Sequence, residues 1–199
     1  MEIMNALVDP EKWRDDFLQK RILVLNQEIY SDIFESVVAW IIQWNIEDSC
    51  ILKKDRQPIT LLINSNGGSI LAAHMLMDAI KTSETPVRTV GLGLIASSAF
   101  YIYLAASERY AFPNSVFLMH EGEIDIENSP SKAKNVMEFF NKVDERIKDY
   151  VVDVTTMTPE EYDDNYTREL YMYADEAKEF GIVNKIIGKD VTLNQFLKG

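Results

Sequence analysis

Two adjacent serines and one histidine are the residues of this sequence best suited to covalent catalysis. Ser97 and Ser98 lie in the stretch GLGLIASSAF at positions 91–100, and His120 ends the stretch FLMH at positions 117–120. A serine placed where a strand runs into a helix lies beside free backbone amides and the positive end of the helix dipole, which stabilise negative charge. Because a histidine can remove the proton from such a serine, these residue types suit acyl transfer through a serine nucleophile.

A pair of glycines in NSNGGS, at positions 64–69, could supply the other half of such a site. Gly67 and Gly68 stand between a predicted strand and a predicted helix, and glycine tolerates the positive φ angles that turn backbone N–H groups outward. Such a turn can hold an oxyanion. Each stretch taken alone favours a simpler interpretation, a tight turn for the glycines and close helix packing with capping hydroxyls for the serines. Only their combination with a histidine favours catalysis.

The two histidines of the chain differ in their surroundings. His74 lies within ILAAHMLMDAI, among the apolar residues of a predicted helix, which indicates a structural role. His120 directly follows a predicted strand, at the edge of a parallel sheet where ligand sites gather. We therefore expect His120, not His74, to be the base.

The elements that must position these residues alternate along the chain. Apolar runs predict strands, and helical spacing with capping residues predicts helices, one of them capped by Ser31. The strands are expected at 21–25, 59–64, 87–93, 116–119 and 182–187, and the helices at 31–44, 69–81, from about 97, at 132–152, from 158 and at 174–181. This alternation predicts one α/β domain with largely parallel strands.

Composition excludes several classes of function. The net charge of −12 over 199 residues argues against a nucleic-acid partner and against binding to anionic membranes. The single cysteine, Cys50, permits neither an internal disulfide nor a CxxC metal site, and no other metal-ligand cluster is present. The N-terminus lacks the basic start and apolar run of a signal peptide. We expect a cytoplasmic protein with no membrane span, metal or cofactor.

Four stretches taken in order resemble the proteolytic subunit of the Clp protease family. They are INSNGGS, GLIASSA, PNSVFLMH and ADEAKEFGIVNKII, and the resemblance covers roughly residues 20–188. It implies a ClpP/crotonase-like fold, a repeated β-β-α spiral in a single domain over residues 1–199. Residues 1–19 are then an N-terminal segment, and residues from about 122 to 152 are a protruding region called the handle in this family.

The resemblance also implies a role for individual residues. Ser97 matches the nucleophile, since Gly93 then aligns with the family's glycine, although an alignment shifted by one residue selects Ser98. His120 matches the base. The backbone N–H groups of Gly68 and Ser98 match the two donors of the oxyanion hole.

The third member of the triad is less well defined by the sequence. Alignment of TREL at 167–170 puts Glu169 where the family usually has aspartate, and Asp163 and Asp164 are nearby substitutes. A glutamate can orient a histidine in such a triad, but it is one methylene longer than aspartate.

The function implied by the resemblance is endopeptidase hydrolysis of unfolded proteins or peptides inside a closed oligomer. The family forms heptameric rings that stack as a tetradecamer and are fed by an AAA+ unfoldase. Two departures weaken parts of that inference. Glu121 and Gly122 follow the histidine where the family has Gln-Pro, and the usual N-terminal loop residues that meet the unfoldase are missing.

Three rival interpretations remain open at the level of sequence. A catalytically silent subunit of a mixed ring is compatible with the unusual Glu169. A related hydrolase with a lysine base is disfavoured because no lysine occurs between Lys81 and Lys132. Acyl-CoA chemistry on the related crotonase fold would leave Ser97 and His120 without a role.

Overall fold

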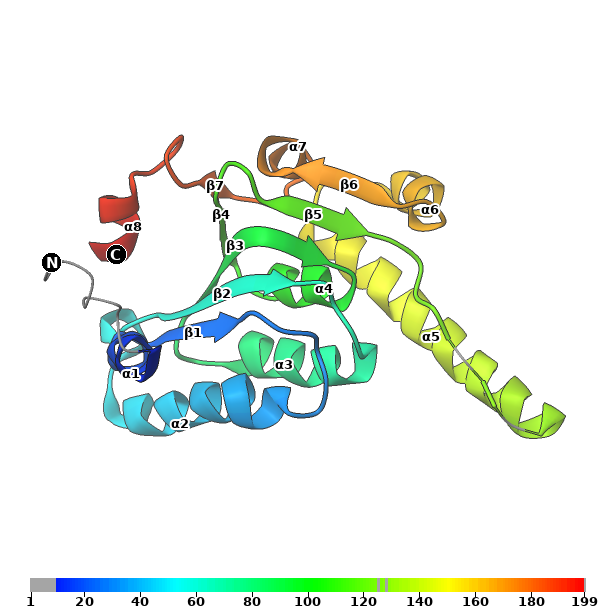
Figure 1. Cartoon of the computed structure of the whole chain (residues 1–199), viewed down its shortest axis with the longest axis horizontal. Helices are drawn as coiled ribbons and strands as arrows, with labels where there is room; N and C mark the ends of the chain where they lie inside the picture. The colour runs from blue at the N-terminus through cyan, green and yellow to red at the C-terminus, as the bar shows by residue number, and fades with distance from the viewer. Residues whose placement is uncertain (1–9, 125, 128, 199) are drawn as a thin grey trace, which may run out of the picture.

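The computed structural model describes residues 10–124, 126–127 and 129–198. Seven strands form one sheet (Figure 1). They are β1 (Ile22–Leu25), β2 (Ile59–Ser65), β3 (Val87–Ala96), β4 (Glu108–Ala111), β5 (Val116–Met119), β6 (Leu170–Tyr173) and β7 (Lys185–Ile186). The strands β1-β2-β3-β4-β7 are neighbours in that order, all parallel, while β5 pairs with β3 in parallel and with β6 in antiparallel.

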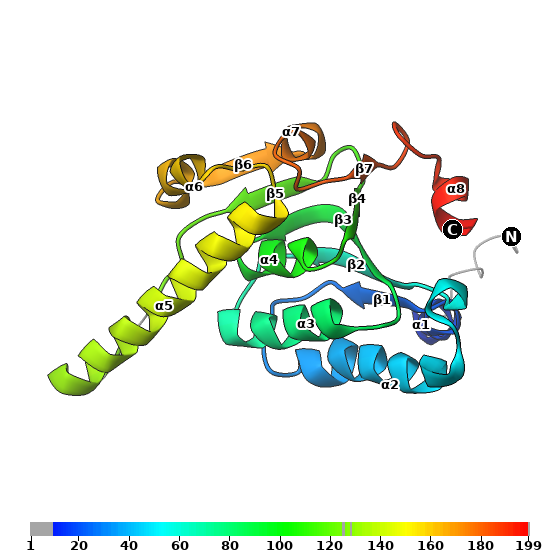
Figure 2. The same cartoon turned by 180° about the vertical axis from the view of Figure 1, so that it is seen from behind.

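Helices connect the strands and cover the sheet (Figures 1 and 2). They are α1 (Pro10–Gln19), α2 (Ala39–Glu47), α3 (Ile70–Thr82), α4 (Ser98–Leu104), α5 (Pro130–Val154), α6 (Pro159–Tyr166), α7 (Ala174–Glu179) and α8 (Leu193–Lys198). Figure 2 shows α2, α3 and α4 on the same side of the sheet. Of the predicted N-terminal segment over residues 1–19, residues 1–9 lie outside the described residues. Within the described residues, no helix combines the length and the apolar character that crossing a membrane requires.

The long strand β3 changes partner halfway, and this change creates the edge at which the candidate residues meet. Residues 88–91 pair with β4, whereas residues 94–96 pair with β5. Between them, Gly93 adopts a φ of +84°, and the Asn64 side chain accepts a hydrogen bond from the Leu94 amide at 3.0 Å. Because β3 and β5 are parallel in this second half, the residues that follow both strands emerge at one edge of the sheet.

Helix α4 is buried along its whole length, which explains its content of small and apolar residues. Two hydrogen bonds tie it to the sheet: the Thr89 hydroxyl donates to the Tyr103 carbonyl at 2.8 Å, and the Tyr103 hydroxyl donates to the Tyr110 carbonyl at 3.0 Å. Burial of each large apolar side chain contributes about 2 kcal/mol. The N-terminus of α4 is therefore held rigidly against the sheet.

The predicted helix over 132–152 is confirmed as α5, which extends two residues further at each end. Its 25 residues span about 37 Å. Val143, Ile147 and Val151 in its C-terminal half are buried, whereas Met137 and Phe139 in its N-terminal half are exposed. In both views the N-terminal half extends away from the sheet (Figures 1 and 2).

The structure also corrects several expected elements. The helix predicted to start at Ser31 instead begins with a π-helical segment over Phe34–Val38 that leads into α2, and the buried Ile33 takes the capping position without a side-chain bond. Burial of Ile33, rather than the capping tendency of serine, decides where this helix begins. Strands β4 and β6 and helices α1 and α8 were not predicted from the sequence, because each is short or weakly patterned.

Candidate active site

Ser97 lies at a strained turn between β3 and α4. Its backbone has φ +55° and ψ −127°, a conformation that costs on the order of 1–3 kcal/mol and clusters at functional sites. The same kind of strand–turn–helix bend exposes the nucleophile of many serine hydrolases. Gly67 packs against this turn so closely that a Cβ added to it would lie 2.6 Å from the Ser97 Cβ. The turn at Ser97 therefore requires glycine at position 67.

In the glycine turn after β2, the Gly68 amide has no hydrogen-bond acceptor among the described residues. The Ile29 amide donates to the Gly67 carbonyl and the Ser69 amide donates to the Ile29 carbonyl, both at 2.8 Å. These two bonds flank Gly68 and do not use its own N–H. A Cβ on Gly68 would lie 2.4 Å from the Ile29 carbonyl oxygen, so only glycine fits this approach. The Gly68 N–H is thus available to an acceptor.

A second free amide belongs to Ser98, the first residue of α4. The Ser97 amide donates to the Leu118 carbonyl at 3.0 Å, which extends the β3–β5 pairing to Ser97. The next N–H, that of Ser98, falls in the first turn of a helix, where amides lack intrahelical acceptors. The Ser98 side chain is 2% exposed, and its hydroxyl has no hydrogen-bond partner among the described residues.

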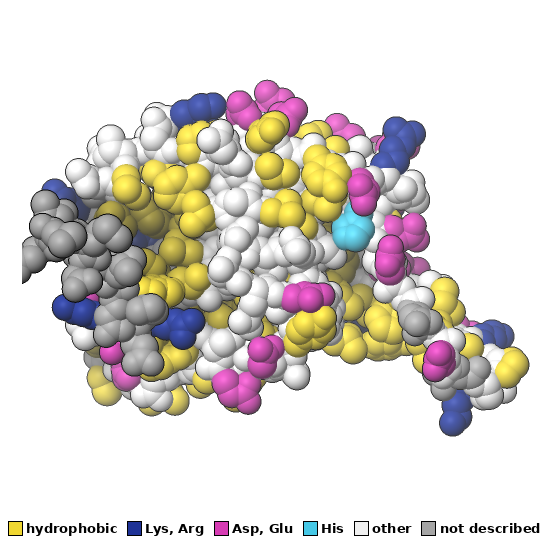
Figure 3. Space-filling view, in the orientation of Figure 1, with side chains coloured by type: hydrophobic (Ala, Val, Ile, Leu, Met, Phe, Trp, Pro, Cys, Tyr) yellow, Lys and Arg dark blue, Asp and Glu magenta, His cyan; other side chains and the backbone are white. Residues whose placement is uncertain are grey.

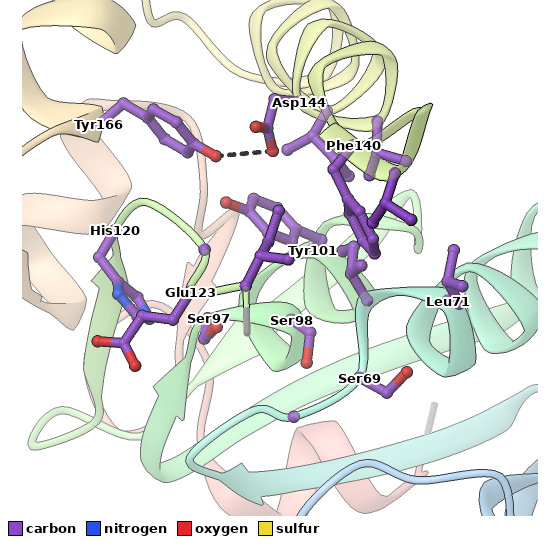
Figure 4. Close-up of a pocket in the computed structure, with 17 residues that line it drawn as sticks. Ser69, Leu71, Ser97, Ser98, Tyr101, His120, Glu123, Phe140, Asp144 and Tyr166 are labelled. Carbon is purple, nitrogen blue, oxygen red and sulfur yellow. Dashed lines mark hydrogen bonds between the residues drawn. The ribbon is translucent and has the colours of Figure 1, made fainter. Parts of the chain in front are cut away.

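His120 follows β5 directly and is half-buried. It lines a cavity of about 380 Å³ together with Gly68, Ser97 and Ser98 (Figure 4). The structure therefore brings four of the five sequence-predicted residues to one cavity. Within the described part of the chain, neither the Ser97 hydroxyl nor the His120 ring makes a side-chain hydrogen bond, so the two are near one another but not joined. His74, expected to be structural, is half-buried on α3, and burial lowers its pKa.

Glu169, the fifth residue, lies next to His120 along the sheet but does not line the cavity. The antiparallel register of β5 and β6 ends at the pair Met119 and Leu170. His120, just after β5, and Glu169, just before β6, are the next opposed positions. Glu169 is exposed, and one of its carboxylate oxygens accepts a hydrogen bond from the Tyr171 hydroxyl at 3.3 Å. The charge of Glu169 raises the pKa of Tyr171.

The two substitutes considered for the third position lie elsewhere. The Asp163 carboxylate pairs with the Lys148 ammonium at 2.6 Å on the surface of α6. Asp164 is exposed on the same helix and, like Asp163, does not line the cavity. Of the three carboxylates considered for this role, the register of β6 brings Glu169 closest to the histidine.

The far wall of the cavity contains polar residues that the sequence analysis missed. Asp144 from α5 accepts a hydrogen bond from the Tyr166 hydroxyl at 2.9 Å, drawn in Figure 4, and Tyr101 lies beside this pair. Burial and the neighbouring Asp144 carboxylate raise the pKa of Tyr166, so its hydroxyl keeps its proton and donates. One signal was available in the sequence: Asp144 stands four residues after Phe140 and three before Ile147, on the apolar face of its helix.

The described residues contain no group of three or more His, Cys, Asp or Glu side chains placed to hold a metal ion. The groups that line the cavity include a hydroxyl, an imidazole and the backbone amides of Gly68 and Ser98. Such a set suits covalent acyl transfer with an oxyanion intermediate.

Comparison with known proteins gives consistent matches. The family model described as Clp protease matches residues 10–190. The chain is 33% identical over 140 residues to the ATP-dependent Clp protease proteolytic subunit 2 of Pseudomonas aeruginosa, covering 68% of this chain and 70% of that protein. It is 29% identical over 194 residues to the ATP-dependent Clp protease proteolytic subunit 2 of Prochlorococcus marinus, covering 93% and 91%. The structure of a ClpP1 mutant from Listeria monocytogenes superposes with a TM-score of 0.77 at 26% identity, covering 92% of this chain and 98% of that one.

Proposed function

Because the chain belongs to the Clp protease family, we propose that it is a serine endopeptidase subunit that hydrolyses peptide bonds of unfolded proteins or peptides. The α/β fold expected from the resemblance, with its long α5, is confirmed by the superposition on a ClpP structure. The observation that carries the proposed activity is the strained turn at Ser97, which faces the same cavity as His120 and two free backbone amides. The proposal treats residues 1–199 as one catalytic domain.

The proposed reaction uses these groups in sequence. The Ser97 oxygen attacks the carbonyl carbon of the scissile bond while His120 accepts the hydroxyl proton. The oxyanion that forms accepts hydrogen bonds from the amides of Gly68 and Ser98, each worth about 3 kcal/mol in the transition state. His120 then gives its proton to the leaving amine as the carbon–nitrogen bond breaks. Water hydrolyses the resulting acyl-enzyme through the same histidine.

Glu169 is proposed to orient His120 and to stabilise its charged form. The β5–β6 register supports this role, because it makes the two residues cross-strand neighbours. To act, the carboxylate has to turn from the Tyr171 hydroxyl toward the imidazole. The Ser97–His120 hydrogen bond also has to form, as catalytic hydrogen bonds often do only once substrate is bound.

The proposal includes assembly and partners. The relatives are named proteolytic subunits of an ATP-dependent protease, and the same organisation is proposed here: heptameric rings stacked as a tetradecamer, supplied by an AAA+ unfoldase. The projecting half of α5 is the proposed handle between rings. An extended peptide would lie along the strand edge beside the glycine turn, and backbone pairing there would tolerate many sequences.

A second candidate function is a catalytically silent subunit in a mixed ring. The observations that favour it are the exposure of Glu169 and its hydrogen bond to Tyr171. Only a chemical test of the serine separates the two candidates.

Covalent labelling by a fluorophosphonate is that test. We expect the assembled protein to be labelled, the Ser97→Ala variant to lose the label, and the Ser98→Ala variant to keep it, because only the backbone amide of Ser98 enters the mechanism. Labelling is measured by intact-protein mass spectrometry. Glu169→Gln is expected to slow labelling by tenfold or more, since the histidine then loses its charged partner.

Three results would contradict parts of this proposal. If Ser98→Ala loses the label and Ser97→Ala keeps it, the nucleophile is Ser98. An unchanged rate in Glu169→Gln would remove Glu169 from the triad. A folded, assembled protein that takes no label would support the silent subunit.

A further inference from the structure

The cavity beside Ser97 extends well beyond the catalytic groups. It reaches from Ser97 and His120 to Asp144 and Tyr166 (Figure 4). Consider a peptide whose scissile carbonyl oxygen lies between the amides of Gly68 and Ser98. The attacked carbonyl carbon is bonded to the Cα of the same residue, and that Cα carries the side chain. In the proposed binding mode, the side chain of the residue that supplies the scissile carbonyl is placed in this cavity, because the cavity adjoins both Ser97 and His120.

Resting on the proposed function, we infer that this cavity selects a basic residue, lysine or arginine, on the carbonyl side of the scissile bond, and that Asp144 is the residue that determines this specificity. The inference combines the shape of the cavity, the signs of the charges in it and one unpartnered hydroxyl.

The walls of the cavity fit the methylene stem of such a side chain. Six apolar lining side chains come from two helices: Ile70 and Leu71 from α3, and Val136, Phe140, Val143 and Ile147 from α5. Lys and Arg bury their stems along apolar surface while their charged ends reach a polar group. A volume of about 380 Å³ is ample for one long side chain.

The charges in the cavity favour a cation. Among the described residues, its lining includes two carboxylates, Glu123 and Asp144, and no Lys or Arg. The Asp144 carboxylate accepts one hydrogen bond, from Tyr166, and a carboxylate offers about four acceptor positions, so it can accept further donors. In the space-filling view, the side chains next to the visible histidine are acidic and hydrophobic (Figure 3).

The Ser98 hydroxyl provides an independent reason to expect a polar ligand. It lines the cavity, is buried, and lacks a hydrogen-bond partner among the described residues. A buried hydroxyl left without a partner costs about 1–3 kcal/mol. An ammonium or guanidinium group brings several donors into the cavity, whereas an apolar side chain would leave this hydroxyl and the Asp144 carboxylate without new partners.

The test compares two substrates and two inhibitors that differ in one residue. Fluorogenic peptides with Arg or Leu before the scissile bond measure kcat/KM, and the matching peptide aldehydes are scored by how well each protects Ser97 from fluorophosphonate. We expect the arginine compounds to be favoured about tenfold or more, as a charged hydrogen bond predicts. This comparison on the unmodified protein needs no variant to fold.

Variants then assign the preference to its residue. Asp144→Asn is expected to abolish the arginine preference, measured as the ratio of kcat/KM for the arginine peptide to kcat/KM for the leucine peptide. Asp149→Asn is the matched control, because Asp149 is exposed on the same helix and does not line the cavity. Ser98→Ala is expected to reduce the preference only in part, since Asp144 remains.

The outcomes distinguish this inference from the proposed function. If the protein is labelled and hydrolyses peptides but prefers leucine, the inference is wrong and the proposed function stands. The same holds if the arginine preference survives Asp144→Asn. Absence of labelling and of hydrolysis would refute the proposed function, and the inference with it.

Discussion

At the scale of single residues, the turn that carries Ser97 depends on Gly67. Gly67 has φ +99°, and a Cβ added to it would lie 2.6 Å from the Ser97 Cβ and 2.8 Å from the Ala96 carbonyl oxygen. We predict that Gly67→Ala reduces the rate of Ser97 labelling by tenfold or more, because a Cβ there forces Ser97 away from His120, and small displacements at a reacting centre are costly. The measurements are the labelling rate and the melting temperature, which shows whether the variant is folded.

Gly188 supplies the control for this prediction. It has a similar φ of +91°, but a Cβ there meets no atom within 4 Å. Gly188→Ala therefore carries a comparable backbone strain, on the order of 1 kcal/mol, without the clash. We expect it to lower the melting temperature and to leave labelling unchanged. Equal labelling rates in the two variants would show that the close approach of Gly67 is not what holds Ser97.

At the scale of elements, helix α6 positions Tyr166 against Asp144, and its start is fixed by a capping box. The Thr158 hydroxyl accepts a hydrogen bond from the Glu161 amide at 3.1 Å, and the Glu161 carboxylate accepts one from the Thr158 amide at 2.8 Å. We predict that Thr158→Ala lowers the free energy of unfolding by about 1 kcal/mol, because one helix amide loses its acceptor. Urea denaturation measures this change.

Two further variants separate the cap from other effects of the substitution. Thr158→Ser keeps the hydroxyl and is expected to restore most of the lost stability. Thr167→Ala makes the same replacement at the other end of α6, where the Thr167 hydroxyl makes no hydrogen bond to the described residues. We expect a change below 0.5 kcal/mol at such an exposed site. A Thr158→Ser variant as unstable as Thr158→Ala would exclude the capping bond as the cause.

At the scale of the whole molecule, the projecting half of α5 carries apolar side chains that the described residues leave exposed. Met137 is 45% exposed and Phe139 is 49% exposed, and Figure 3 shows hydrophobic side chains along this projection. Under the proposed assembly this surface is buried between rings. We predict that Phe139→Glu reduces the native complex to single rings or smaller species without lowering monomer stability, as measured by native mass spectrometry and thermal melting.

Asn141→Glu is the matched control for assembly. Asn141 is exposed on the same helix and lies about 200° around the helix axis from Phe139, since successive residues are about 100° apart. The Asn141→Glu variant adds the same charge on a different face of α5. We therefore expect its native complex to keep the mass of the unmodified assembly. An equal loss of mass in both variants would attribute dissociation to added charge rather than to the apolar contact.

Much of the fold and part of the candidate site could be predicted from the sequence. The strand of residues 116–119 matches β5, and the predicted helices from Ser69 and from Thr158 match α3 and α6 to within one residue at their starts. These elements have strong local patterns: apolar runs, capping residues and glycine turns. The same patterns singled out Ser97, His120 and Gly68, because each stands where one element ends and the next begins.

The tertiary structure decided what depends on pairing between distant segments. β6 has only four residues, Leu170–Tyr173, and it pairs with β5. Only that pairing makes Glu169 a neighbour of His120. The place of Asp144 on the apolar face of its helix was visible in the sequence, but only the packing of α5 against α4 shows that this face lines the cavity. Local sequence specifies an element and its ends through short-range hydrogen bonds and side-chain spacing. Which elements meet is decided by the burial of surfaces contributed by the whole chain, and no short stretch contains that information.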